Sequence, residues 1–259
     1  MNYNYHTHTY MCRHASGTPA EYIEKAIAGG IEFMGFSDHI PHIAKDGTQS
    51  SYRVPYDKAR EYVSELADLR DKYKEKIEIS IGFESEYYPE VFDEMVNYAV
   101  SVGCEYLILG PHFLREERPE DEHTITPTES LDALKNYVSN VTSAIESGAF
   151  TYVAHPDIFN FKGDVSVYRE YMRKICKASR EHNVPLEINF LGIRDNRNYP
   201  NELFWQVAGE EQAPVTFGFD AHTVDSACDR ESQKRAEEIS KKYGLNYIGK
   251  PEIIRLKKR

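Results

Sequence analysis

Seven short runs of apolar residues recur along the 259-residue chain, and segments with helical periodicity separate them. Several runs are almost continuously apolar, which is typical of strands whose two faces are both buried. Strands that alternate with helices indicate repeated β-α units and therefore a parallel sheet. We expect these strands at residues 3–6, 33–37, 77–83, 106–109, 151–154, 186–189 and 215–219.

The segments between these runs carry helix signals of their own. Thr18-Pro19-Ala20-Glu21 supplies an N-cap, a proline at the first helical position and a capping-box glutamate, and Gly29-Gly30 supplies a stop. Apolar residues at helical spacing within residues 59–73 predict one face that packs on the sheet. Segments near residues 130–147 and 167–182 follow the same plan.

The length suits one α/β barrel, a class that commonly spans roughly 200–250 residues. We find no linker, low-complexity segment or sequence repeat, so we predict a single domain over residues 1–259. Long polar connections follow the second, fourth and sixth runs, at residues 42–56, 115–128 and 192–201. Each lies at the carboxyl end of a strand, where barrel enzymes place their active-site loops.

Every apolar run ends in a side chain that can bind a metal ion. An isolated histidine beside a strand usually has a structural role, but the same chemistry at seven strand ends indicates one shared site, because imidazole and carboxylate groups are what divalent transition metals require. We leave His42, His123 and His182 outside this set. The candidates are His6 and His8, His39, Glu84, His112, His155, Glu187 with Asn189, and Asp220 with His222.

Three of these ends repeat one spacing, in which two potential ligands stand two residues apart. They are His6-Thr7-His8, Glu84-Ser85-Glu86 and Asp220-Ala221-His222. On a strand this spacing directs both side chains to the same face, so both can reach one ion. Closure of a barrel would bring the first and last strands together and make distant ligands neighbours.

These motifs, in this order, resemble those of the polymerase and histidinol phosphatase (PHP) superfamily. The resemblance spans nearly the whole chain and is nearest to the stand-alone histidinol-phosphatase type, because Leu186-Glu187-Ile188-Asn189, Gly192-Ile193-Arg194 and Tyr199-Pro200 are similar to that branch. It implies a distorted (β/α)7 TIM-like barrel with three divalent metal ions. The matching motifs are His6-Thr7-His8-Thr9 with the later His14, Ser37-Asp38-His39, Gly82-Phe83-Glu84, Gly110-Pro111-His112-Phe113, His155-Pro156-Asp157 and Asp220-Ala221-His222.

The resemblance also implies how the ligands are shared among the three ions. A first site would use His6, His8, Glu84 and Asp220; a second would use the bridging Glu84 with His112 and His155; a third would use His14, His39 and His222. Catalysis would depend on Glu84, Asp220 and His222. Zinc, manganese and iron all suit such ligands. Pro111, and the Arg194-Asp195-Asn196-Arg197 segment, depart from the family pattern in substrate loops.

The expected reaction is hydrolysis of a small phosphomonoester, with L-histidinol phosphate of histidine biosynthesis as the substrate that the resemblance implies. A metal-bridging hydroxide would attack phosphorus, because bound metal lowers the pKa of water from 15.7 to about 7. Arginine forks fit phosphate oxygens, and we expect Arg194, Arg197 and Arg53 to bind the substrate. Arg115 and Arg118 stand beside Glu116 and Glu117 and are expected to be solvated or paired with nearby acids.

Three further side chains have roles that the sequence leaves open or indirect. Asp157 would orient a ligand, handle a proton or begin a turn. Asp38 would support the ligands rather than bind metal, because it precedes His39 on the opposite strand face. A carboxylate at the mouth of the site, in the general area of Glu86 and Glu187, would recognise an amino group of the substrate.

Charge and composition limit the partners. The net charge is −11, which disfavours long nucleic acid and anionic membranes. No apolar stretch approaches the ~20 residues of a membrane span, and the N-terminus lacks the pattern of a secretory signal, so the cytoplasm is the expected location.

The four cysteines are far apart, which argues against a thiolate zinc site and a disulfide framework. The sequence carries no signal of oligomeric state.

Two alternatives stay open at this point. The first is a phosphoesterase that acts on a nucleotide or another small phosphate ester. The second is a metal-stabilised binding domain without catalysis. The complete set of candidate ligands favours an enzyme, and turnover by the metal-loaded protein would separate the two classes.

Overall fold

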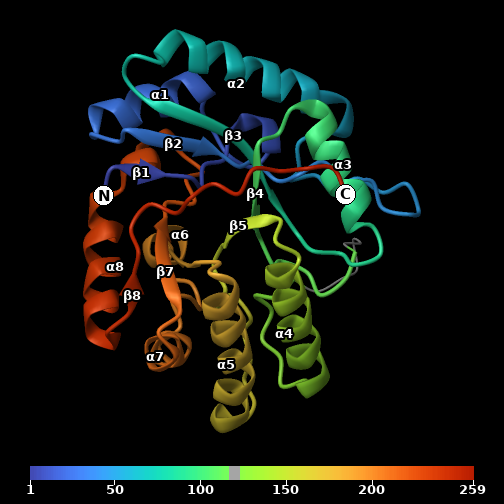
Figure 1. Cartoon of the computed structure of the whole chain (residues 1–259), viewed down its shortest axis with the longest axis vertical. Coiled ribbons are helices and arrows are strands. Elements are labelled where there is room, and N and C mark those ends of the chain that lie inside the picture. The colour runs from blue at the N-terminus through green and yellow to red at the C-terminus, as the bar shows by residue number, and fades with distance from the viewer. Residues whose placement is uncertain (117–122) are drawn as a thin grey trace.

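The computed structural model describes residues 1–116 and 123–259. Eight parallel strands form one sheet in the order of the chain, with helices packed around it (Figure 1). Seven of them are the predicted strands, and a short eighth, β8, adds to the far side of β7. The strands are β1 (Tyr3–Asn4), β2 (Phe33–Phe36), β3 (Glu78–Ser85), β4 (Tyr106–Leu109), β5 (Phe150–Val153), β6 (Leu186–Asn189), β7 (Pro214–Gly218) and β8 (Asn246–Tyr247).

The helices follow the strands, as the alternating pattern predicts, and the α/β TIM-like fold is confirmed. Thr18 and Glu21 form the predicted capping box at the start of α1. The third long connection is not wholly irregular, because Gly192 lies inside the short helix α6. The helices are α1 (Pro19–Ala28), α2 (Ala59–Tyr73), α3 (Phe92–Val102), α4 (Leu131–Glu146), α5 (Val165–His182), α6 (Phe190–Arg194), α7 (Glu202–Glu211) and α8 (Arg230–Tyr243), with short 3-10 turns at Tyr10–Cys12, Tyr56–Lys58 and Val224–Cys228.

The first and seventh strands meet beyond their carboxyl ends. Thr7 and Ala221 form a parallel bridge, in which the His8 N–H donates to the Ala221 carbonyl at 2.9 Å and the Ala221 N–H donates to the His6 carbonyl at 3.2 Å. β1 itself ends at Asn4, two residues earlier than predicted, because the His6 N–H donates to the Asn4 side chain instead of continuing the ladder with β2. The two ends of the sheet therefore meet where the candidate ligands lie.

A tyrosine-rich core fills the inside of the barrel, below those ligands. It consists of Tyr3, Tyr5, Tyr106, Ile108, Tyr152 and Ala154, which alternate with residues that face the surrounding helices. The C-terminal segment then crosses the amino ends of the strands, towards α3 (Figure 1): the Ile254 N–H donates to Thr151 and the Leu256 N–H donates to the Glu105 carbonyl. Ile253 packs against the tyrosine-rich core from this side.

None of the helices in the described part of the chain combines the length and the apolar character that crossing a bilayer requires. The four cysteines are free thiols, of which Cys12, Cys104 and Cys176 are buried and Cys228 is partly buried.

Candidate metal centre

The carboxyl ends of the strands bring all nine predicted ligands into one cluster. Glu84 lies at its centre on β3 and approaches five imidazoles with its two carboxylate oxygens. Its Oε2 lies 3.3 Å from His8 Nε2, 3.3 Å from His39 Nδ1 and 3.5 Å from His6 Nε2. Its Oε1 lies 3.0 Å from His155 Nε2 and 3.5 Å from His112 Nε2. A carboxylate in this place can bridge ions, as the resemblance implies for Glu84.

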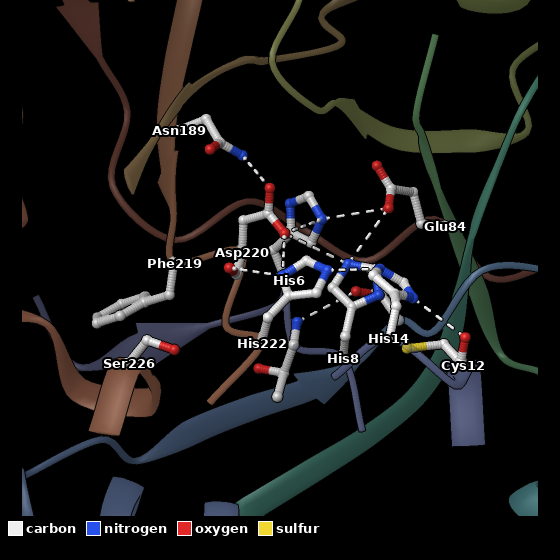
Figure 2. Close-up of polar contacts among 12 residues, drawn as sticks. His6, His8, Cys12, His14, Glu84, Asn189, Phe219, Asp220, His222 and Ser226 are labelled. Carbon is white, nitrogen blue, oxygen red and sulfur yellow. Dashed lines mark hydrogen bonds and ion pairs between the residues drawn. The ribbon is translucent and has the colours of Figure 1, made fainter. Parts of the chain in front are cut away.

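Asp220 faces the same imidazoles from the end of β7. Its Oδ1 lies 3.5 Å from His6 Nε2 and 3.4 Å from His8 Nε2. Figure 2 shows this carboxylate among the histidines, with the Asn189 amide on its other side. His222 Nδ1 lies 3.2 Å from the same Oδ1. The four side chains thus share one small volume.

The predicted third group is also close together. His14 Nε2 and His222 Nε2 lie 2.8 Å apart, and ligand atoms of His8, His14, His39 and His222 all lie within 4.8 Å of one another. His14 is held by its Nδ1, which hydrogen-bonds the Cys12 carbonyl at 3.1 Å (Figure 2). His8 therefore belongs geometrically to two of the predicted groups.

The donor set fits a metal centre because several of its buried polar atoms lack a hydrogen-bond partner among the described residues. Buried polar atoms in proteins are almost always hydrogen-bonded, and exceptions call for an ion, a water or a function. Here the atoms without a hydrogen-bond partner include His6 Nε2, both ring nitrogens of His8, His39 Nδ1, His155 Nδ1 and Asp220 Oδ1. Most of these atoms point to the space that the nine side chains surround.

The charges of the site favour a cation as well. Burial alone would raise the pKa of Glu84, but the neighbouring imidazoles of His112, His6 and His39 outweigh burial and hold the pKa well below its usual value. Burial lowers the pKa of His6, but Glu187 and the other nearby carboxylates outweigh it and raise the pKa to about 10. Carboxylates that attract a proton to this ring would equally attract a metal ion.

A second layer of side chains fixes the ligand rings. His6 Nδ1 lies 2.8 Å from Glu187 Oε1, and His112 Nδ1 lies 3.0 Å from Glu86 Oε1. Such outer partners set the tautomer and orientation of a metal-binding histidine. Glu86 and Glu187 therefore lie behind the ligands, and neither is the mouth carboxylate that we expected in their area. Asp195 is a carboxylate that lines the cavity above the site.

Asp38 and Asp157 hold the loops that carry the ligands. The Asp38 carboxylate accepts from the Thr9 N–H and from the Thr9 hydroxyl, each at 2.7 Å, which fits the supporting role expected for it. Asp157 Oδ2 accepts from the Asn201 N–H at 2.5 Å and from the Trp205 ring at 2.8 Å. Asp157 thus ties the end of β5 to the start of α7, and burial raises its pKa to about 7.

A cavity of about 690 Å³ opens over the cluster. Its size is within the ~300–1,000 Å³ of small-molecule sites. Besides seven of the predicted ligands, the walls include Tyr52, His123, Ile158, Leu191, Arg194, Asp195, Arg197 and Tyr199. Residues from the three long connections therefore meet here, as their position after the strands predicts.

His123 lines the cavity wall, although the prediction from the sequence left it outside the candidate site. Its Nδ1 accepts from the Ile125 N–H at 3.1 Å, so the single proton of the neutral ring is on Nε2. Its ring centre lies 5.3 Å from that of His112. The only available signal was its place in the connection after the fourth strand. His42, in contrast, pairs with Glu116 at 2.9 Å.

The three arginines expected to bind substrate differ in their surroundings. Arg197 lines the cavity and donates to Tyr199 and Asp195. Arg194 lines it too, but its guanidinium already donates to backbone carbonyls and to Asp229.

Arg53 is not among the cavity-lining residues. It is 2% exposed and pairs with Glu86 Oε2 at 2.7 Å, behind His112. The position of Arg53 favours support of Glu86 over contact with a phosphate. Arg115 is exposed at the surface, and Arg118 lies outside the described residues.

Comparisons with known proteins agree with this architecture. A histidinol-phosphatase of Bacillus subtilis is 28% identical over 249 residues, covering 84% of this chain and 92% of that protein. A probable histidinol-phosphatase of Deinococcus radiodurans is 24% identical over 222 residues, covering 84% and 85%. The crystal structure of histidinol phosphate phosphatase from Lactococcus lactis, complexed with zinc, L-histidinol and phosphate, superposes with a TM-score of 0.72 at 19% identity and covers 99% of both chains.

The family model of the PHP domain matches residues 4–190, which include seven of the nine predicted ligands. Asp220 and His222 lie beyond the matched residues and join the cluster through the seventh strand. With a match over more than half of its length, the chain belongs to the PHP domain family.

Proposed function

We propose that this chain is a metal-dependent phosphatase that hydrolyses L-histidinol phosphate to L-histidinol and phosphate, a reaction of histidine biosynthesis. The observation that carries the proposal is the convergence of nine candidate ligands, several with unpartnered buried nitrogens, below a cavity of suitable size. The names of the relatives from B. subtilis and D. radiodurans support the choice of substrate.

The metal ligands in this proposal are the nine residues in the three groups that the family resemblance implies. His6, His8, Glu84 and Asp220 would hold one ion; Glu84, His112 and His155 a second; His14, His39 and His222 a third. Divalent ions in such a site neutralise phosphate charge and make water nucleophilic near neutral pH. Zinc in the L. lactis structure supports zinc as one suitable metal.

The protein itself would bind and orient the substrate. Arg197 offers a guanidinium to the phosphate from the cavity wall, and the Nε2–H of His123 offers a neutral donor near His112. Asp195, whose carboxylate is 48% exposed, would accept from the ammonium group of histidinol at the mouth. Ile158 and Leu191 supply apolar wall for the rest of the molecule.

We also propose one domain for residues 1–259, because strands from Tyr3 to Tyr247 belong to a single sheet. The four free thiols are compatible with a cytoplasmic location, which we propose.

The test is phosphate release by the metal-reconstituted protein from L-histidinol phosphate and from a panel of sugar phosphates, nucleotides and other phosphomonoesters. We expect a strong preference for L-histidinol phosphate that is lost with a chelator and restored with metal. Faster turnover of a nucleotide would keep the chemistry and reject the substrate. No turnover of any ester would support the metal-stabilised binding domain.

A further inference from the structure

The backbone of Asp220 has an unusual conformation for a candidate metal ligand. Its φ is +46°, in the left-handed region that residues other than glycine rarely occupy. Residues persist in such regions only where their surroundings hold them. The conformation matters because it turns the Asp220 carboxylate towards His6 and His8, and any relaxation of the backbone would move Oδ1 away from both rings.

Arg194, the last residue of α6, holds this backbone on both sides of the Asp220 Cα. Its Nη1 donates to the Phe219 carbonyl at 3.0 Å and its Nη2 donates to the Asp220 carbonyl at 2.9 Å. Those two carbonyls belong to the peptide groups before and after Asp220. A planar guanidinium that binds both therefore restrains the φ and the ψ of this one residue.

The guanidinium is itself fixed from its far side. Arg194 Nη1 pairs with Asp229 Oδ2 at 3.0 Å, and the Asp229 carboxylate is only 10% exposed. Asp229 is the N-cap of α8, where its Oδ1 accepts from the Ser232 N–H at 2.9 Å. The α8 N-terminus thus supports the Arg194 guanidinium through Asp229. The Asp229 carboxylate and the Phe219 carbonyl together engage both protons of Nη1.

The other end of α6 holds the carboxylate of the same residue. Asn189, the N-cap of α6, donates from Nδ2 to Asp220 Oδ2 at 3.0 Å (Figure 2). The same Nδ2 donates to Glu187 Oε2 at 2.9 Å. Its Oδ1 accepts from the Gly192 N–H, so the amide orientation is determined. One short helix thus contacts the side chain of Asp220 at its start and the backbone of Asp220 at its end.

We propose that Arg194 is a positioning residue for the metal centre, which acts through the backbone of Asp220 rather than by binding the phosphate. This deepens the proposed function, because it rests on Asp220 being a metal ligand. It assigns phosphate contact in the cavity to Arg197 instead. The consequence is that substitution of Arg194 should weaken metal binding even when no substrate is present.

The experiment measures metal content by elemental analysis, and zinc affinity by titration of the chelator-treated protein, for wild type, Arg194→Ala, Arg194→Lys and Asp229→Asn. We expect Arg194→Ala to lower the affinity of one site by about 10–100-fold, the usual effect of losing an outer partner of a ligand. Arg194→Lys should also lose affinity, because one ammonium cannot reproduce the planar fork. Asp229→Asn should show a smaller loss of the same kind.

Arg197→Ala is the matched control, because Arg197 lines the same cavity but has no hydrogen bond to Phe219 or Asp220 within residues 1–116 and 123–259. It should keep full metal affinity. If Arg194→Ala keeps wild-type metal content and affinity while KM rises, the positioning role is wrong and phosphate contact is right. Should Arg194→Ala fail to fold, unchanged affinity in both Arg194→Lys and Asp229→Asn would overturn the proposal. Because metal content and zinc affinity are measured without an ester, these two results do not depend on which ester the protein hydrolyses.

Discussion

The two ends of the barrel differ in how most of their buried polar groups are partnered. At the amino end, Tyr106 donates its hydroxyl proton to the Tyr5 carbonyl, and the Tyr3 hydroxyl lies 2.9 Å from that of Thr216, although the Tyr152 hydroxyl has no partner among the described residues. At the carboxyl end, His6 Nε2 and both ring nitrogens of His8 are equally buried but have no hydrogen-bond partner among the described residues. The amino end is arranged for stability, while the carboxyl end keeps binding capacity for a ligand, as barrels generally divide these tasks.

β3 connects the two ends, and its residues show the contrast within one strand. Gly82 accommodates the Tyr106 ring, since a Cβ at this position would lie 2.4 Å from Tyr106 Cε1. Glu84, two residues later, is surrounded by imidazoles. A substitution at Gly82 should therefore lower the stability of the protein, whereas a substitution at Glu84 should lower its metal content.

The largest effect is expected for Glu84→Gln. An amide carries no negative charge and presents one oxygen, so it should hold the shared ions poorly and reduce activity by at least about 100-fold. Bound metal should fall while the circular dichroism spectrum stays that of a folded barrel. Glu78→Gln, at the exposed start of the same strand, is the control and should be neutral. Near-normal turnover and metal content in Glu84→Gln would remove Glu84 from the centre.

Gly82→Ala should act on the amino end. The added methyl group meets the buried Tyr106 ring, and overpacking of this kind costs about 1–3 kcal/mol. We expect the denaturant midpoint and Tm to fall while metal stoichiometry at 25 °C is unchanged. An unchanged Tm would show that the Tyr106 ring can shift to accommodate the methyl group without loss of stability.

Tyr106→Phe removes a smaller contribution from the same core. The variant loses the hydroxyl that donates to the Tyr5 carbonyl at 3.0 Å and reaches the Phe36 carbonyl at 3.2 Å. A buried hydrogen bond contributes about 1 kcal/mol, and that is the expected loss of unfolding free energy in urea. Tyr10→Phe, at a residue 42% exposed, is the matched control and should change stability little. Equal effects in the two variants would contradict the account of this core.

Asp195→Asn should have the smallest effect and should concern the substrate alone. A partly exposed ion pair contributes about 0.2–1 kcal/mol, which corresponds to a KM for L-histidinol phosphate raised by about 1.4- to fivefold with kcat retained. The KM of a phosphomonoester without an amino group should rise less, through the pairing of Asp195 with Arg197 alone. An equal rise in KM for both esters would exclude Asp195 as the contact of the ammonium group.

The sequence was sufficient to predict the strands, and to predict that the candidate side chains at their carboxyl ends lie together, because both depend on local patterns. Apolar runs mark strands, and parallel strands necessarily bring their carboxyl ends to one edge, so His6 and Asp220 become neighbours despite their distance in sequence. The end of β1 was placed two residues too late, because the Asn4 side chain takes the His6 N–H out of the ladder. The hydrophobic pattern does not show when a polar side chain accepts a backbone N–H that would otherwise pair with the neighbouring strand.

The roles of the arginines could not be predicted in the same way. An arginine in a substrate loop binds a phosphate or a protein group according to which partner the fold places beside it. Glu86 lies beside Arg53 and Asp229 beside Arg194, each more than thirty residues away in the chain. His123 was missed for a related reason, because its place in the cavity wall is set by the path of the connection after β4.

The most direct test of the central claim is anomalous diffraction from crystals of the metal-loaded protein. The account predicts three peaks at the carboxyl ends of the strands: one among His6, His8, Glu84 and Asp220, one among Glu84, His112 and His155, and one among His14, His39 and His222. Glu84 should bridge the first two. No peak within this cluster, or metal bound elsewhere on the barrel, would contradict it.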